Sequence, residues 1–154
     1  MHGENIDVDG FRLNGNYSFQ YCRNVVIRNA EIHSKDAFWN TEDVTVYDSV
    51  VDGEYLGWHS RNLRLVNCRI SGTQALCYAE NLVLENCTLG EDADLCFEYS
   101  SVHAEIKGRV HSVKNPRSGR IVAEEYGDII LDEHCKAPAN CSIETEKKQS
   151  GEAA

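Results

Sequence analysis

The sequence lacks long hydrophobic runs. No stretch approaches the about 20 apolar residues needed to cross a bilayer, and residues 1–30 hold no apolar segment flanked by positive charge. We therefore expect no membrane span and no export signal. Basic residues are also scarce, with 15 Lys and Arg against 25 Asp and Glu and a formal net charge of −10. Such a chain repels phosphate backbones and anionic lipid, which argues against nucleic-acid and membrane-surface binding.

Paired cysteine motifs are absent as well. The chain has seven cysteines but no Cys-x-x-Cys spacing, which is typical of free thiols in a reducing compartment. We therefore predict a cytoplasmic protein with no metal and no cofactor. Cys68 and Cys87 have the same spacing as Cys77 and Cys96, and we expect both pairs to stack as reduced thiols. A zinc site is the weaker alternative, because no histidine shares their positions in the repeat described next.

An internal repeat is present instead, and its unit is nineteen residues long. Rows that start at Asn5, Asn24, Asp43, Asn62 and Asn81 align with one another. Their second, fourth and ninth positions are aliphatic in every row: Ile6, Val25, Val44, Leu63, Leu82; Val8, Ile27, Val46, Leu65, Leu84; and Leu13, Ile32, Val51, Ile70, Leu89. Within a row the apolar residues alternate, which is strand patterning and not a helical stripe.

The repeat length predicts the architecture. Nineteen residues suit three short strands and their turns, and leave too little chain for a helical crossover. A leucine-rich repeat is rejected, because its strand leucine is followed by two residues before the Asn, whereas only Val66 separates Leu65 from Asn67. We therefore predict an all-β, single-stranded, right-handed parallel β-helix of about six to seven coils over residues 1–145, followed by a disordered tail over residues 146–154.

Other columns of the repeat support this register. The sixth position carries Asn29, Asp48, Asn67 and Asn86, with Gly10 in the first row, and predicts a bend with a ladder of amide side chains. A second bend is predicted at Gly15, Ser34, Gly53 and Gly72. The nineteenth position alternates in charge as Arg23, Glu42, Arg61 and Glu80. After Glu98 the rhythm slips by one residue, so two irregular coils are expected, with a loop over Lys114–Gly119.

Three stretches resemble a bacterial family of β-helix proteins, the DUF3737 family: GEYLGWHSRNLRLVNCRISGTQALCYAENLVLENC (Gly53–Cys87), FEYSSVHAEIKG (Phe97–Gly108) and SVKNPRSG (Ser112–Gly119). The resemblance covers roughly residues 5–133 and implies a pectin-lyase-like right-handed β-helix. It carries no catalytic residue with it. It also implies that the chain corresponds to the C-terminal portion of the family pattern. An N-terminal coil without a cap exposes backbone groups and core, so we expect it to be covered by self-association.

The third segment of each coil is rich in aromatic residues. Alternate side chains of a strand face opposite ways, yet one set (Trp39, Trp58, Cys77, Cys96) and the other (Asn40, His59, Tyr78, Phe97) are both largely apolar. Three interpretations remain open: a third sheet covered by a subunit contact or by the C-terminal tail, a saccharide groove with Trp and Tyr as stacking platforms, or strand boundaries displaced by one residue. The candidate ligand-binding residues are Trp39, Asn40, Trp58, His59, Tyr78 and Tyr99.

Acidic residues collect beside this segment. Glycosidases place two carboxylates about 5–10 Å apart, and Asp92, Asp94 and Glu98, with Glu54 two coils earlier, are candidates. His59 is the candidate histidine, although a partly buried, hydrogen-bonded histidine is the default interpretation. The basic residues Arg117 and Arg120 do not belong to a known lyase motif. Two hypotheses follow: a non-catalytic module for assembly or ligand binding, which we favour, and a carbohydrate-active lyase or hydrolase, which rests on fold analogy alone.

Overall fold

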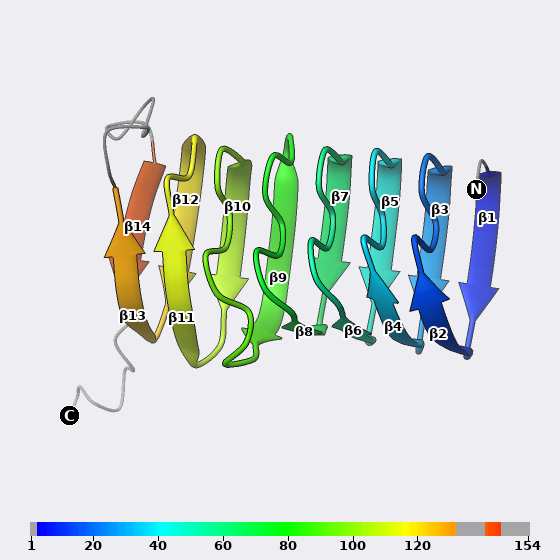
Figure 1. Cartoon of the computed structure of the whole chain (residues 1–154), viewed down its shortest axis with the longest axis horizontal. Helices are drawn as coiled ribbons and strands as arrows, with labels where there is room; N and C mark the ends of the chain where they lie inside the picture. The colour runs from blue at the N-terminus through cyan, green and yellow to red at the C-terminus, as the bar shows by residue number, and fades with distance from the viewer. Residues whose placement is uncertain (1–2, 132–140, 146–154) are drawn as a thin grey trace.

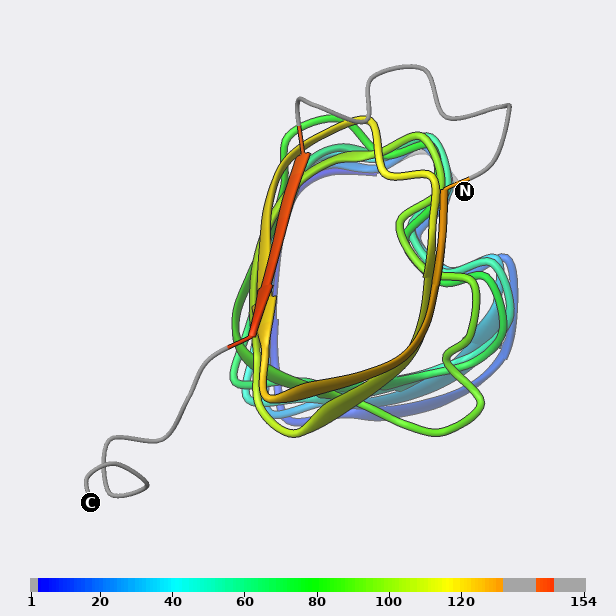
Figure 2. The same ribbon diagram turned by 90° about the vertical axis from the view of Figure 1, so that its left-hand side faces the viewer.

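The computed structural model describes residues 3–131 and 141–145 and shows a parallel β-helix. The predicted tail, residues 146–154, lies outside the described residues. In Figure 2 the chain runs down on the left, returns up on the right and advances toward the viewer, so the β-helix is right-handed. In the parts of the chain that are described there is no helix, and hence none long and apolar enough to cross a membrane.

The strands follow one another along the β-helix axis (Figure 1). Their bounds are β1 (Glu4–Asp9), β2 (Arg12–Asn16), β3 (Arg23–Arg28), β4 (Glu31–Lys35), β5 (Glu42–Tyr47), β6 (Val50–Asp52), β7 (Arg61–Val66), β8 (Arg69–Ser71), β9 (Leu82–Leu89), β10 (Ser101–Ile106), β11 (Arg109–Lys114), β12 (Ser118–Ala123), β13 (Glu125–Ile130) and β14 (Cys141–Thr145).

Two parallel sheets run the length of this stack. One contains β1, β3, β5, β7, β9, β10, β12 and β14 in that order, and the other β2, β4, β6, β8 and the end of β9. The pair β11–β13 continues the second side in the last coils. Only residues 115–117 connect β11 to β12, so the predicted loop is shorter than the sequence suggested.

The predicted register is confirmed. Val44 pairs with Val25 on one side and with Leu63 on the other, so side chains one repeat apart lie directly above one another. The second aliphatic column pairs Val46 with Ile27 and Leu65, and all three side chains are fully buried. Stacked aliphatic columns are therefore the core, and burial of such side chains stabilises the fold by about 1.5–3 kcal/mol each.

The polar columns confirm the register independently. Glu42 pairs with Arg23 and with Arg61, and its carboxylate lies 3.5 Å from the Arg61 guanidinium. The predicted amide ladder is present, because Asn86 donates to Asn67 at 2.6 Å and Asn67 donates to Asp48 at 3.2 Å. A second ladder, which the sequence did not lead us to expect, joins Asn81 to Asn62 at 2.7 Å and Asn62 to Asp43 at 2.8 Å.

The second bend occurs in only some coils. Strands β2 and β4 run through Gly15 and Ser34, whereas β6 and β8 end just before Gly53 and Gly72. Gly72 has φ +114, and a Cβ there would lie 2.1 Å from the Gly53 carbonyl oxygen. Glycine is therefore required at this bend because two coils come too close for any side chain.

The first coil differs from those that follow it. Ile6, Val8 and Leu13 are only partly buried, whereas Val25, Ile27 and Ile32 above them are fully buried. Side chains of core type are therefore partly exposed in this coil. The predicted self-association through it stays a prediction.

Candidate ligand-binding site

In the first five coils the third segment is a turn and not a strand. In the second coil Asp36, Phe38 and Asn40 have φ values of 56, 63 and 55°, so alternate residues are left-handed. The segment is nevertheless bonded to both neighbouring coils: the Phe38 N–H donates to the Ser18 carbonyl at 3.0 Å and the Asn40 N–H to the Trp58 carbonyl at 3.0 Å. The prediction of three strands per coil is therefore wrong, and a coil of this kind has two strands and a hydrogen-bonded turn.

This alternating conformation explains why the segment is apolar on both sets of positions. Residues with positive φ change the direction in which the following side chain points. The strand rule that neighbouring side chains face opposite ways therefore no longer applies. Ala37 and Phe38 are adjacent in sequence and both are fully buried. Tyr17 and Tyr21, at outer positions of the first coil, are 52% and 45% exposed. Figure 2 shows that coils from the N-terminal end bow outward on one side, where the last coils run straight.

Two residues are inserted before the fifth turn segment. The Thr88 N–H donates to the Cys68 carbonyl of the preceding coil, and the Phe97 N–H donates to the Ala75 carbonyl of that same coil. From Thr88 to Phe97 the chain therefore advances two residues further than from Cys68 to Ala75. The extra residues lie between Gly90 and Asp94, so the register of the turn is displaced by two residues. The predicted displacement of one residue is present in β10, where Ala104 pairs with Leu84.

Because the sequence analysis missed this insertion, several predicted placements in the fifth turn are wrong. Phe97 takes the buried position of Leu76, and Cys96 is fully buried in the core, so neither belongs to the outer face. Glu98 and Tyr99 instead follow Cys77 and Tyr78 in the next coil. The predicted stacking of Cys77 on Cys96 is therefore wrong. Cys68 and Cys87 do occupy equivalent positions, since the Cys68 thiol bonds to the Val46 carbonyl and the Cys87 thiol to the Leu65 carbonyl one coil later.

The turns bring a set of rings together on successive coils. We call this region the aromatic surface. It consists of the rings of Tyr21, Trp39, Tyr55, Trp58, His59, Tyr78 and Tyr99, together with the side chain of Asn40. Trp39 and Trp58 stack with centroids 5.9 Å apart and planes 20° apart. His59 stacks on Tyr78 at 5.2 Å, and Tyr78 meets Tyr99 at 5.6 Å. The predicted ligand-binding residues therefore do form one continuous surface along the β-helix axis.

Trp58 lies at the centre of this surface. Its ring contacts Trp39, Tyr55 and Tyr78, and its indole N–H donates to the Gln74 carbonyl at 2.6 Å. Much of the ring is therefore used in contacts within the protein. Each such ring pair contributes about 0.5–1.5 kcal/mol beyond its buried area.

The outermost column of the surface consists of side chains whose polar groups can form hydrogen bonds. Asn40 and His59 are exposed, and Tyr78 and Tyr99 are half-buried. They follow one another at equivalent positions of successive coils, about 4.8 Å apart, with Tyr21 before them. Burial, together with the nearby Glu98, raises the pKa of Tyr78, so its hydroxyl keeps its proton at neutral pH. This column presents amide, imidazole and phenol groups along one line.

Three of the acidic candidates have partners within the fold. Asp92 accepts a hydrogen bond from the Gly72 N–H at 3.3 Å, Asp94 accepts one from the Thr73 hydroxyl, and Glu98 lies 3.5 Å from the Lys114 ammonium. His59 is two coils away from Glu98 in this arrangement, with Tyr78 between them. The structure therefore does not bring His59 together with the three carboxylates.

Beside the aromatic surface, the carboxylate of Asp36 has one oxygen without a partner. Asp36 and Tyr55 occupy equivalent positions in successive coils. The Asp36 N–H donates to the Glu54 carbonyl of the next coil, and the Tyr55 N–H donates in the same way to the Thr73 carbonyl. The Asp36 side chain is 8% exposed, and its Oδ1 has no hydrogen-bond partner in the described structure. Burial raises the pKa of this carboxyl, whereas the Lys35 charge lowers it.

Comparison with known proteins identifies the family of the chain. The family model described as a protein of unknown function, DUF3737, matches residues 1–144. The chain belongs to the DUF3737 family. No curated protein and no solved structure matched the chain.

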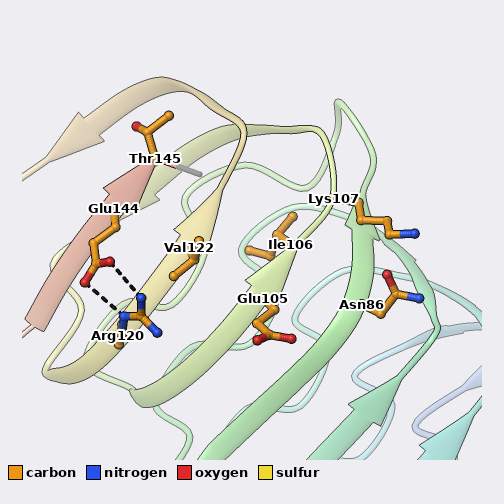
Figure 3. A pocket seen from close by; sticks show the side chains of 8 residues that line it. All are labelled: Asn86, Glu105, Ile106, Lys107, Arg120, Val122, Glu144 and Thr145. Carbon is orange, nitrogen blue, oxygen red and sulfur yellow. Dashed lines mark hydrogen bonds and ion pairs between the residues drawn. The ribbon is translucent and has the colours of Figure 1, made fainter. Parts of the chain in front are cut away.

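A second surface of the DUF3737 chain forms a shallow depression of about 420 Å³ over β10, β12 and β14 (Figure 3). Arg120 and Glu144 form a double hydrogen bond across it, with both distances 2.9 Å. The guanidinium lowers the pKa of Glu144 to about 2, so these two charges satisfy each other. Its lining is Asn86, Glu105, Ile106, Lys107, Arg120, Val122, Glu144 and Thr145, with no aromatic ring among them.

The described part of this DUF3737 chain has no cluster of three or more His, Cys, Asp or Glu residues that can hold a metal. No disulfide joins its described cysteines, and Cys135 lies outside the described residues. Sequence reasoning missed Asp36 and Tyr55 as site residues. The signal was present, because Tyr17, Asp36 and Tyr55 recur at the same interval as the other columns.

Proposed function

We propose that this DUF3737 protein is a non-catalytic β-helix module that binds an extended glycan along the aromatic surface. The observation that carries the proposal is the column Asn40, His59, Tyr78 and Tyr99, which places one hydrogen-bonding group on each of successive coils beside half-buried rings. A glycan chain presents hydroxyl groups at a regular spacing along its length, together with apolar ring faces. Both features match a surface with polar tips and aromatic sides.

The alternative, a polysaccharide lyase or glycoside hydrolase, has less support. Glycoside hydrolysis requires two carboxylates on either side of the bond that is cut. Asp92, Asp94 and Glu98 are each hydrogen-bonded or ion-paired to residues of a neighbouring coil. The proposal therefore uses the surface for binding and assigns no acid or base.

A glycan array with the full chain tests the proposal, followed by titration of any glycan that binds. His59→Ala and Tyr78→Phe each remove one outward polar group, and each is expected to weaken binding about 3- to 10-fold, the effect of one lost hydrogen bond. Turnover of a bound glycan would support the enzyme instead.

Two matched variants control for changes unrelated to the surface. His103 is an exposed histidine on β10 and Tyr47 is a tyrosine of β5, and neither belongs to the aromatic surface. His103→Ala and Tyr47→Phe should leave glycan affinity unchanged. The proposal would be abandoned if no glycan on the array bound, or if the two controls weakened binding as much as the test variants.

A further inference from the structure

The outermost column of the aromatic surface is a row of structurally equivalent residues. Their φ values lie between 55 and 60° at every position: Tyr21, Asn40, His59, Tyr78 and Tyr99. The same backbone conformation at equivalent positions points their Cα–Cβ bonds in one direction. The His59 and Tyr78 rings are 5.2 Å apart, and the Tyr78 and Tyr99 rings 5.6 Å. The column therefore presents one polar group per coil along the β-helix axis.

Rings are costly residues for this backbone. Positive φ suits Gly and Asn, and it costs another L-residue about 1–2 kcal/mol. At Phe38, which also has positive φ, full burial of the side chain in the core offsets this cost. His59 is exposed and Tyr21 is 45% exposed, so packing in the core does not offset it there. Contact with a ligand would account for both.

The column itself carries no carboxylate, ammonium or guanidinium group. The charges beside it are matched within the protein, since Glu98 lies 3.5 Å from the Lys114 ammonium. The Lys35 charge interacts with the Asp36 carboxyl, and its ammonium lies 5.9 Å from the centroid of the Tyr55 ring. Amide, imidazole and phenol groups form hydrogen bonds with hydroxyl groups, and a net charge of −10 repels an anionic polymer. The column is therefore suited to an uncharged ligand.

The column has a definite end in the sixth coil. The Tyr99 N–H donates to the Asn115 carbonyl, so Pro116 is the next residue in the column. Pro116 is buried and has no polar side-chain group. Figure 2 shows the same change, because the last coils run straight where the earlier coils bow outward. From Tyr21 to Tyr99 the column spans four coil steps, or about 19 Å.

An extended glycan fits a column of this spacing. In a β-1,4-linked hexose chain each sugar advances by close to one coil step, and both edges of the ribbon carry hydroxyl groups. An α-1,4-linked chain curves away from a straight column. We propose that the column binds a neutral β-1,4-linked glycan over about five sugar units, one for each coil from Tyr21 to Tyr99. This inference rests on the proposed glycan-binding function and names the class and length of the glycan.

The test is calorimetric titration of the full chain with three hexamers. Cellohexaose is neutral and β-1,4-linked, maltohexaose is neutral and α-1,4-linked, and hexamannuronate is β-1,4-linked and charged. We expect cellohexaose to bind about 10-fold or more tightly than the other two, the effect of one or two hydrogen bonds. Shorter cello-oligosaccharides should gain about 3- to 10-fold in affinity per added sugar up to the pentamer, and the hexamer should add little.

Tyr21→Phe removes the phenol hydroxyl at one end of the column. It should weaken binding of cellopentaose about 3- to 10-fold and leave that of cellotetraose nearly unchanged, because four sugars still fit on the other four coils. Tyr17→Phe is the matched control, since Tyr17 belongs to the same turn and is 52% exposed but lies outside the column. It should change neither affinity.

Three results would overturn this assignment and leave glycan binding intact: maltohexaose or hexamannuronate binding as tightly as cellohexaose, equal losses in Tyr17→Phe and Tyr21→Phe, or no binding of cellohexaose while another glycan on the array binds. Failure of all three hexamers together with a silent glycan array would overturn both proposals.

Discussion

Individual left-handed residues shape this molecule at the smallest scale. Asn67 has φ 56° at the first bend of its coil, and its amide both accepts from Asn86 and donates to Asp48. A left-handed conformation costs a typical L-residue about 1–2 kcal/mol, and less for Asn, whose side chain bonds locally. The ladder therefore combines a residue type that tolerates the bend with a hydrogen bond to the coils on either side.

Trp58 is expected to serve both stability and binding. Trp58→Ala removes its contacts with four rings and the bond to Gln74, and should destabilise the fold by about 3–5 kcal/mol while weakening glycan affinity. His59→Ala should weaken glycan binding with a much smaller loss of stability, because the His59 side chain is exposed. Urea unfolding and glycan titration of both variants separate the two effects. Unchanged glycan affinity in a folded Trp58→Ala variant would remove this ring from the site.

His33 is expected to make stability depend on pH. Hydrogen bonds to Glu31 at 2.8 Å and to Asp52 at 3.2 Å raise its pKa, while the pKa values of both carboxyls are lowered. Arg12 also faces Glu31, and the Ser71 hydroxyl donates to Asp52. The imidazolium stabilises the fold fully below the ordinary histidine pKa of 6.5, and this contribution is lost as pH rises through the raised value. The carboxylates stabilise the fold above their ordinary pKa values, and their contribution is lost as pH falls.

The contribution of this cluster should therefore be largest between about pH 4.5 and 6.5. His33→Gln is predicted to reduce the free energy of unfolding most in that window and progressively less toward alkaline pH. Urea titrations of wild type, His33→Gln and the control His103→Gln at several pH values measure the difference. A loss of stability that is the same at every pH would show that the charge of His33 has no part in it.

At the scale of the element, strands were predictable and turns were not. The strands β3, β5 and β7 follow from alternating aliphatic residues that recur once per repeat, because both periods act directly on side chains that stack in the core. The turn segments were misread, because adjacent residues such as Ala37 and Phe38 are both buried where alternate residues of the backbone have positive φ. The insertion before Asp94 was also missed, since Cys77 and Cys96 matched at the expected spacing by coincidence.

The glycine bend offers a sharp test at this scale. Gly72→Ala places a methyl group 2.1 Å from the Gly53 carbonyl oxygen at φ +114, and should destabilise the fold by about 2 kcal/mol or more. Gly108→Ala is the matched control, because Gly108 has φ +84 but no atom within 4 Å of the added Cβ, so only the backbone cost of about 1 kcal/mol applies. Chemical unfolding compares them. Equal losses would mean that the close approach of the coils is not what requires glycine at position 72.

At the scale of the whole molecule, each coil contacts mainly its two neighbours, so stability is approximately a sum over coils and their interfaces. The first coil is the weak point, since Ile6 and Val8 are only partly buried. We expect the chain to self-associate through this coil, and light scattering should show mass rising with concentration. Ile6→Lys should suppress that rise, whereas the exposed-site variant Asp128→Asn should not. A strictly monomeric wild type at high concentration would contradict the prediction.

The stacked pairs Arg23–Glu42 and Glu42–Arg61 have a consequence for how such a molecule changes length. Excising one repeat unit, from Asp43 to Arg61, keeps every aliphatic residue above another, yet it sets Glu42 against Glu80. Excising two units, from Asn24 to Arg61, joins Arg23 to Glu80 and restores attraction. Insertion or deletion of two repeats at a time should therefore be favoured in this solenoid over that of a single repeat. The unit of length change is then a pair of coils, one with a basic and one with an acidic residue in this column.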